Sequence, residues 1–254
     1  MGKIISIANH KGGVGKTTTS SSLGVALSMK GKRVLLIDLD SQGNLSSLFV
    51  HHEPERTIFE AIKEGKSLPV VQVSDSLDIV PSSKDLVVIE KILTLQYGGS
   101  GNAKEYTILR SLLASLRDSY DYILIDCPPS MGDLTINALS ASDGVIITMT
   151  PESFPTKGLD DLLDAIRRTK TSLNKSLVLS GILITRYNRR KINRIVEESL
   201  RRTFGDIVFT TKIRENVDIT ESPLYCKDIF SYSPNSIGAK DYLELATEVL
   251  RKIK

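Results

Sequence analysis

The sequence predicts an α/β fold, a mostly parallel β-sheet with helices on both faces. Short apolar runs typical of buried strands alternate with longer segments of helical periodicity along almost the whole chain. Neither a low-complexity linker nor an internal repeat interrupts this alternation, so we expect residues 1–254 to form one domain. With 254 residues, of which 41% are hydrophobic and 25% charged, the chain has the composition of a globular protein with a substantial core.

The order of the elements follows from these patterns. The predicted strands are IISIA (4–8), RVLLID (33–38), LDIV (77–80), YILID (122–126), GVIIT (144–148), VLSGILI (178–184) and a short IVF (207–209). Amphipathic helices fit residues 84–95, 106–117, 155–172, 190–204 and 237–252, and residues 96–105 predict an exposed loop. Ligands of such sheets bind at the carboxyl ends of the strands, which makes the residues after each strand the candidates for chemistry.

The composition also excludes several classes of protein. No apolar stretch approaches the roughly 20 residues of a membrane helix, and the chain enters a strand almost at once, so we expect no secretory signal peptide. Cys127 and Cys226 are too few for a disulfide framework and are consistent with a reducing cytosol. The three histidines show no metal-ligand spacing with the cysteines. We therefore expect a cytoplasmic protein.

The run KGGVGKTT, residues 11–18, lies between the first strand and a helical segment. Its glycines permit a bend in which successive N–H groups point inward, and the helix N-terminus adds its own unpaired N–H groups. This arrangement predicts a phosphate-binding loop, with Lys16 on the β- and γ-phosphates and the Thr17 hydroxyl on Mg²⁺. The expected nucleotide-binding residues of the loop are Lys11, Gly12, Gly13, Val14, Gly15, Lys16, Thr17 and Thr18.

Two further strands end in carboxylates. LLIDLDSQGN carries Asp38 and Asp40, of which one could hold the water shell of a metal while the other orients an attacking water. The stretch YDYILIDCPPS ends its strand in Asp126, a candidate for Mg²⁺ binding through water, and two prolines then stiffen the exit. Beside the loop of residues 11–18, a catalytic interpretation of these acids is favoured over solvated loop acids.

The strict pattern G-x-x-x-x-G-K-[ST] fails here, because its first glycine is His10, whereas a second lysine, Lys11, precedes Lys16 by five residues. KGGVGKTT resembles the deviant Walker A motif of the ParA/MinD ATPases. Together with DLDSQGN, DCPPS and the tail ITESPLYCKDIFSYSPNSIGAKDYLELATEVL, it makes essentially the whole chain similar to the ParA family of DNA-segregation ATPases.

The resemblance implies a nucleotide site and a dimer. It implies ATP sandwiched between two subunits, with Lys11 crossing to the nucleotide of the partner. Lys16 and Thr17 would lie on the phosphates and Mg²⁺, Asp126 on the metal shell, and Asp40 would position the hydrolytic water. Asp38 would link the metal site to the switch, and Arg186 and Asn188 in the segment TRYN would lie by the adenine.

The branches of this family differ in what they bind when loaded with ATP. MinD-like chains end in an extra basic amphipathic helix, whereas Leu243, Leu245, Val249 and Leu250 of the final helix here are expected to be core. The motif DCPPS also resembles ParA, so we expect no membrane binding. The chain begins at the first strand, which resembles the small ParA type without an N-terminal helix-turn-helix domain.

A basic segment is the candidate for DNA binding. Residues 186–214 hold nine Lys or Arg against three acids, although the net charge of the chain is only +3. On a helix over 190–204 we expect Ile192, Ile195, Val196 and Leu200 to be buried, with arginines on another side. The candidate DNA-binding residues are Arg190, Arg194, Arg201, Arg202, Lys212 and Arg214, which would neutralise phosphates without reading sequence. A solvated helix face remains the alternative.

Asp218 is a departure from the family pattern, because it stands where an arginine implicated in DNA contact is usual. A carboxylate there repels phosphate, so the DNA surface is expected to be shifted toward the basic segment, or DNA binding to be weaker. The sequence thus predicts an ATP- and Mg²⁺-dependent ATPase for plasmid or chromosome partition. Its dimer would bind nucleoid DNA non-specifically, and a ParB-like protein would stimulate hydrolysis. An ATPase that positions a protein cargo and a MinD-like membrane-associated ATPase remain alternatives.

Overall fold

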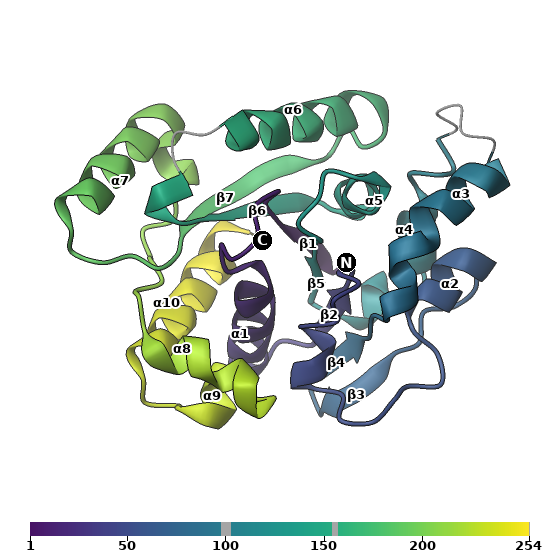
Figure 1. The fold of residues 1–254 in the computed structure, drawn as a ribbon, viewed down its shortest axis with the longest axis horizontal. Helices are drawn as coiled ribbons and strands as arrows, with labels where there is room; N and C mark the ends of the chain where they lie inside the picture. Colours follow the sequence, from purple (N-terminus) through teal and green to yellow (C-terminus); the bar gives the residue numbers. More distant parts are fainter. Residues whose placement is uncertain (98–102, 154–156, 254) are drawn as a thin grey trace.

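The computed structural model describes residues 1–97, 103–153 and 157–253, and within them the chain folds around one seven-stranded sheet (Figure 1). The strand order is β3-β4-β2-β5-β1-β6-β7, and every neighbouring pair is parallel except β3–β4. The strands are β1 (Lys3–Ala8), β2 (Val34–Asp38), β3 (Val71–Ser74), β4 (Leu77–Val80), β5 (Tyr122–Asp126), β6 (Gly144–Met149) and β7 (Val178–Ile184). The predicted mostly parallel α/β fold is confirmed.

One face of the sheet is covered by the first and the last helices, which contact each other. These are α1 (Lys16–Met29), α8 (Val217–Glu221), α9 (Ile229–Tyr232) and α10 (Ile237–Lys252). Alternation along β1 sends Ile5 and Ile7 into the core on this side. Leu245 and Val249 of α10 are fully buried here, and Leu243 and Leu250 pack against the same cluster, as the sequence predicts.

The opposite face carries the intervening helices (Figure 1). These are α2 (Ile58–Glu64), α3 (Ile89–Tyr97), α4 (Ile108–Leu113), α5 (Asp133–Ala141), α6 (Lys157–Ser172) and α7 (Lys191–Phe204). Short 3₁₀ turns complete the described chain: η1 (Ser46–Leu48), η2 (Lys84–Val88), η3 (Arg117–Ser119), η4 (Pro151–Ser153), η5 (Gly205–Ile207) and η6 (Ser222–Tyr225). Ile4 and Ala8 of β1 face the core on this side, so the sheet is buried on both faces.

Several local predictions are wrong. Residues 207–209 are not a strand: Ile207 ends η5, and Val208 forms only an isolated bridge to Ile182. Strand β3 and helices α2 and α5 were not predicted, and the helix expected over 84–95 is divided into η2 and α3. Of the predicted loop 96–105, residues 98–102 lie outside the described part, whereas Glu105 is only 2% exposed and accepts a hydrogen bond from Thr94.

Helix α7 buries a different stripe from the expected one. Ile192 is 55% exposed and Ile195 49% exposed, while Asn193, Val196 and Leu200 face the protein. The helix contacts η4 and η5 at the edge of the sheet formed by β7, so only a narrow strip of its surface is buried. No helix in the described part of the chain is long and apolar enough to cross a bilayer.

The topology brings the three motifs of the sequence together. Strands β2, β5 and β1 are neighbours at the centre of the sheet, and Asp38 pairs in register with Asp126 at the carboxyl ends of β2 and β5. Residues 9–15 leave β1 at the same edge, and Gly15 caps α1 in the left-handed conformation. This edge is therefore where a ligand can meet all three motifs.

Candidate nucleotide-binding site

The loop between β1 and α1 has the backbone of a phosphate-binding loop. Gly13 and Gly15 have φ angles of 71° and 82°, a region that favours glycine, and a Cβ on Gly15 would also lie 3.4 Å from Thr185 Cγ2. Gly12 and Gly13 are exposed, whereas Val14 is buried and its carbonyl accepts a hydrogen bond from the Thr185 hydroxyl at 2.9 Å. The loop thus exposes its glycine backbone at the N-terminus of α1, where an anion is favoured.

Lys16 lies folded back into this loop. Its side chain is buried, with the residue only 7% exposed, and Nζ donates to the carbonyl of Lys11 at 2.9 Å. Burial lowers the pKa of Lys16, although Asp126, Cys127 and Asp40 act in the opposite sense. Three donors on a desolvated cation in a concave loop are suited to phosphate oxygens.

Lys11 is placed differently. Its backbone N–H donates to Asn9 Oδ1 at 3.0 Å, and its carbonyl accepts from Lys16, so the backbone belongs to the loop. The ammonium makes no hydrogen bond or ion pair with any residue that the structure describes, and Lys11 does not line either cavity at the loop.

Asp126 ends β5 directly beneath the loop and is fully buried. Its Oδ1 accepts a hydrogen bond from Ser20 Oγ at 3.0 Å, while Oδ2 is buried with no hydrogen-bond partner among the described residues. Burial and the neighbouring Asp38 raise the pKa of Asp126 to about 8, although the hydroxyls of Thr17 and Ser20 and the charge of Lys16 lower it. An orphaned carboxylate oxygen beside a threonine hydroxyl fits Mg²⁺, which prefers oxygen ligands and retains several waters.

Asp38 lies beside Asp126, but both of its oxygens are directed at protein donors. Oδ1 accepts the N–H of Asp40 at 3.1 Å, and Oδ2 accepts the N–H and hydroxyl of Ser46 at 2.8 and 2.6 Å. Burial raises the pKa of Asp38 to about 6 against these hydrogen bonds. Its contacts are therefore with the loop after β2.

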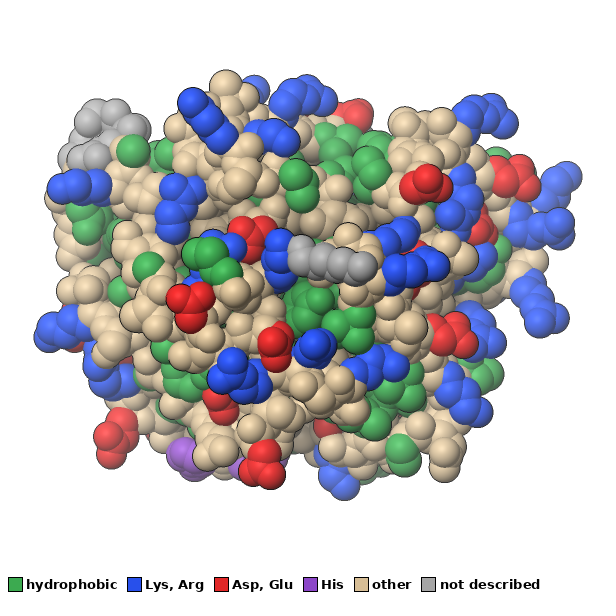
Figure 2. All heavy atoms as spheres, turned by 180° about the vertical axis from the view of Figure 1, so that it is seen from behind, with side chains coloured by type: hydrophobic (Ala, Val, Ile, Leu, Met, Phe, Trp, Pro, Cys, Tyr) green, Lys and Arg blue, Asp and Glu red, His purple; other side chains and the backbone are tan. Residues whose placement is uncertain are grey.

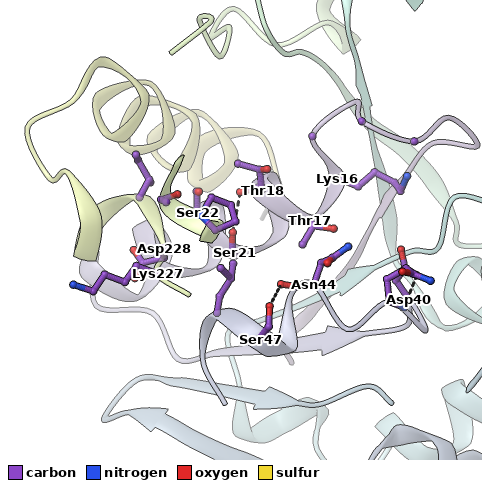
Figure 3. A pocket seen from close by; sticks show the side chains of 18 of the residues that line it. Lys16, Thr17, Thr18, Ser21, Ser22, Asp40, Asn44, Ser47, Lys227 and Asp228 are labelled. Atoms are coloured by element: carbon purple, nitrogen blue, oxygen red, sulfur yellow. Dashed lines mark hydrogen bonds between the residues drawn. The ribbon is translucent and has the colours of Figure 1, made fainter. Parts of the chain in front are cut away.

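Asp40 and the loop glycines line a cavity of about 430 Å³ (Figure 3). Asp40 is 8% exposed, and its Oδ1 accepts the N–H of Gln42 at 3.0 Å. In Figure 3, Lys16 and Asp40 lie toward one end of the cavity and Lys227 lies at the other. The far wall comes from the segment after α8: Ser222, Pro223, Lys227, Asp228 and Ile229. The carboxylate of Asp40 and the ammonium of Lys16 thus border the same cavity at the carboxyl edge of the sheet.

A second cavity, of about 270 Å³, adjoins the first through Gly13, Gly15 and Thr18. Arg186 lines it, with a φ of 50°, together with Asn216 and the buried Tyr242. Asn188 does not line this cavity, because its side chain is bonded to Glu215 and Asn193. The volume of the first cavity is typical of small-molecule sites, and that of the second lies just below their usual range.

The predicted DNA-binding residues fall into two groups. Arg201 and Lys212 both contact Glu197, at 3.1 and 2.8 Å, and Arg214 is paired with Asp241. Arg190, Arg194 and Arg202 are exposed and make no ion pair within the described residues. Basic side chains gather along the edge of the molecule where α7 lies, at the right in Figure 2.

Sequence reasoning missed several residues of the site. Ser20 lies one helical turn after Lys16, so helical spacing alone could have indicated it. Thr185 and the wall formed by residues 222–229 come from distant parts of the chain, and no local pattern indicates them.

Comparison with known proteins identifies the family. A family model described as an AAA domain matches residues 2–179. The chain is 40% identical to the sporulation initiation inhibitor protein Soj of Bacillus subtilis, over 98% of each chain. It is 39% identical to the chromosome partitioning protein ParA of Caulobacter vibrioides, over 98% of this chain and 94% of that one. The chain belongs to the ParA family of P-loop ATPases.

The fold of this ParA-family chain also matches a solved structure named cobyrinic acid a,c-diamide synthase, from Mycobacterium smegmatis, with bound ADP and magnesium. The TM-score is 0.83 at 32% identity, covering 99% of this chain and 95% of that one. The family assignment rests on the relatives, and the solved structure adds that a close structural counterpart holds a nucleotide and magnesium.

Proposed function

We propose that this ParA-family ATPase hydrolyses Mg²⁺-ATP to partition plasmid or chromosomal DNA. The observation that carries the proposal is the cavity at the carboxyl ends of β1, β2 and β5, where Lys16, Asp40 and the loop glycines meet above the buried Asp126. The names of the 39–40% identical relatives support the partitioning role.

The residues of the site divide the work of hydrolysis. The backbone N–H groups of residues 12–17 and the ammonium of Lys16 bind the phosphates, and Thr17 and Asp126 would hold Mg²⁺. Bound Mg²⁺ neutralises charge on the phosphate oxygens. Asp40 orients the attacking water, because its carboxylate borders the same cavity as Lys16. The adjoining cavity at Arg186 takes the base.

ATP brings two copies together in this proposal. The ammonium of Lys11, which pairs with none of the described residues, supports it, since a cation without a role in its own subunit is available to a phosphate of the partner. The exposed Arg190, Arg194 and Arg202 then bind DNA phosphates without reading sequence, which would associate the dimer with the nucleoid. A ParB-like protein would accelerate hydrolysis and release the dimer.

The test is binding to non-specific duplex DNA with ATP, ADP or no nucleotide, across a salt series. We expect ATP-dependent binding that weakens steeply with salt. The triple variant Arg190→Ala, Arg194→Ala, Arg202→Ala should lower the salt slope by about one unit for each DNA phosphate that is no longer neutralised. Arg167→Ala, an exposed arginine of α6 paired with Asp164, is the matched control. An unchanged slope in the triple variant would rule out the α7 surface.

Other outcomes lead to the alternatives. A protein that dimerises with ATP but binds no DNA in any state would contradict the partition proposal. Co-sedimentation with liposomes in ATP would then favour a MinD-like role. Its absence would favour positioning of a protein cargo by another route.

A further inference from the structure

The loop that carries Asp40 is hydrogen-bonded near both of its ends to the carboxylate of Asp38. Asp38, the last residue of β2, accepts the N–H of Asp40 on Oδ1 and the N–H of Ser46 on Oδ2, at 3.1 and 2.8 Å. Within the loop, the N–H of Gly43 donates to the carbonyl of Asp40 at 2.9 Å. These hydrogen bonds hold the two ends of the loop close together at the buried carboxyl end of β2.

Ser46 ties this closed loop to a second strand. Its hydroxyl donates to Asp38 Oδ2 at 2.6 Å and accepts the N–H of Ser82 at 2.9 Å. Ser82 lies just after β4, which pairs with β2. Ser46 is 8% exposed and does not line the nucleotide cavity, although Asn44 and Ser47 on either side of it do. One buried hydroxyl thus joins the loop, β2 and the segment after β4.

The direction of the Asp40 carboxylate depends on this loop. The carboxylate accepts a hydrogen bond from the N–H of Gln42, which belongs to the same loop. Any rotation of the loop about its fastened ends would therefore carry Asp40 with it. A general base or water-orienting acid is sensitive to such displacement, since a shift of about 1 Å can cost about 100-fold in rate.

We propose that Ser46 is a positioning residue for ATP hydrolysis. Through its hydrogen bonds to Asp38 and to the Ser82 N–H, it keeps the Asp40 carboxylate in a fixed position relative to Lys16. The proposal rests on the hydrolytic role of Asp40 in the proposed function. Loss of Ser46 should therefore affect hydrolysis and not nucleotide affinity, because the phosphate loop is held by contacts to Asn9 and Thr185 that do not involve Ser46.

The test measures single-turnover ATP hydrolysis and the affinity for a non-hydrolysable ATP analogue in Ser46→Ala. We expect the hydrolysis rate to fall about tenfold, the lower range for outer-sphere partners of a site, and the analogue Kd to stay within about twofold. Ser111→Ala, at an exposed serine on α4, is the matched control. A Ser46→Ala rate within about twofold of wild type would overturn the proposal, as would an analogue Kd that worsens as much as the rate.

A double-mutant cycle distinguishes positioning from general destabilisation. In an Asp40→Ala background, Ser46→Ala should lower the residual rate no further, because there is no carboxylate left to position. A further tenfold loss there would overturn the proposal. If Ser46→Ala does not fold, Ser46→Cys takes its place with the same expectations, since a thiol fills the space but hydrogen-bonds weakly. If Asp40→Ala hydrolyses ATP as fast as wild type, the proposed function of Asp40 fails instead.

Discussion

The buried Asp126 should make the stability of the nucleotide-free protein fall as pH rises. Its pKa is raised from 3.8 to about 8, first by burial and then by Asp38, so the folded state holds a proton that the unfolded chain has released. Stability from this group is complete below about pH 4 and is lost as pH rises toward 8. Asp126→Asn removes the titration while keeping an oxygen that can accept from Ser20.

The size of the effect follows from linkage. While the folded carboxyl is protonated and the unfolded one ionised, each pH unit costs about 1.4 kcal/mol, so wild type should lose about 3 kcal/mol more than Asp126→Asn between pH 5 and 7. For a chain of this length that corresponds to roughly 6–12 °C in Tm. Asp38, whose pKa is raised to about 6 by burial, is present in both proteins, so its titration contributes to both curves.

The measurement is urea unfolding of wild type and Asp126→Asn in EDTA without nucleotide, followed by circular dichroism at pH 5, 6 and 7. The exposed Asp118→Asn controls for loss of a carboxylate elsewhere. Free energies of unfolding for wild type and Asp126→Asn that run parallel within about 0.5 kcal/mol over this range would refute the reasoning.

Three further expectations concern single side chains. Lys16→Ala should weaken nucleotide affinity about 10- to 100-fold through loss of charged hydrogen bonds, measured with a fluorescent ADP; affinity equal to wild type would contradict the role of the loop. Gly158→Ala would place a Cβ in steric overlap with the ring of His10, which directly precedes the phosphate loop, and should weaken nucleotide affinity severalfold. Removal of the ring in Gly158→Ala/His10→Ala should restore that affinity. If the affinity does not recover, the overlap with the ring is not the cause of the loss. Glu248→Gln should lower the free energy of unfolding by about 2 kcal/mol at pH 7. Burial alone would raise the pKa of Glu248, but two backbone N–H groups that donate to its carboxylate hold the pKa at about 2. That difference in urea unfolding should shrink as pH falls below about 4.5, and a constant difference would contradict it.

The helical period of residues 190–204 marks the limit of local reasoning. The sequence predicts the extent of α7 to within one residue but not which apolar side chains it buries. A period gives the faces of a helix, while the face that is buried depends on which neighbour it meets. Ile192 and Ile195 are exposed because α7 lies at the edge of the sheet, a position that only strand order decides.

The partners of charged side chains are likewise not predictable from the sequence alone. Nine basic residues in 186–214 are visible in the sequence, but the partners that engage Arg214 and Lys212 are Asp241, on α10, and Glu197. Likewise, the sequence indicates Asp38 as a carboxylate at a strand end, whereas in the structure its Oδ2 accepts two hydrogen bonds from Ser46, eight residues further along the chain. These pairings need the chain folded, because they join residues that no local rule relates.

Sequence patterns were sufficient to predict the phosphate loop, six of the seven strands and the meeting of three motifs at one sheet edge. Glycine at positive φ, apolar runs and the rule that parallel strands end together are local or nearly local constraints. The second cavity at Arg186, the wall at residues 222–229 and the division of the basic residues into paired and unpaired ones are visible only in the folded chain. These arise from contacts between segments far apart in the chain, whose geometry is set by packing of the whole core on both faces of the sheet.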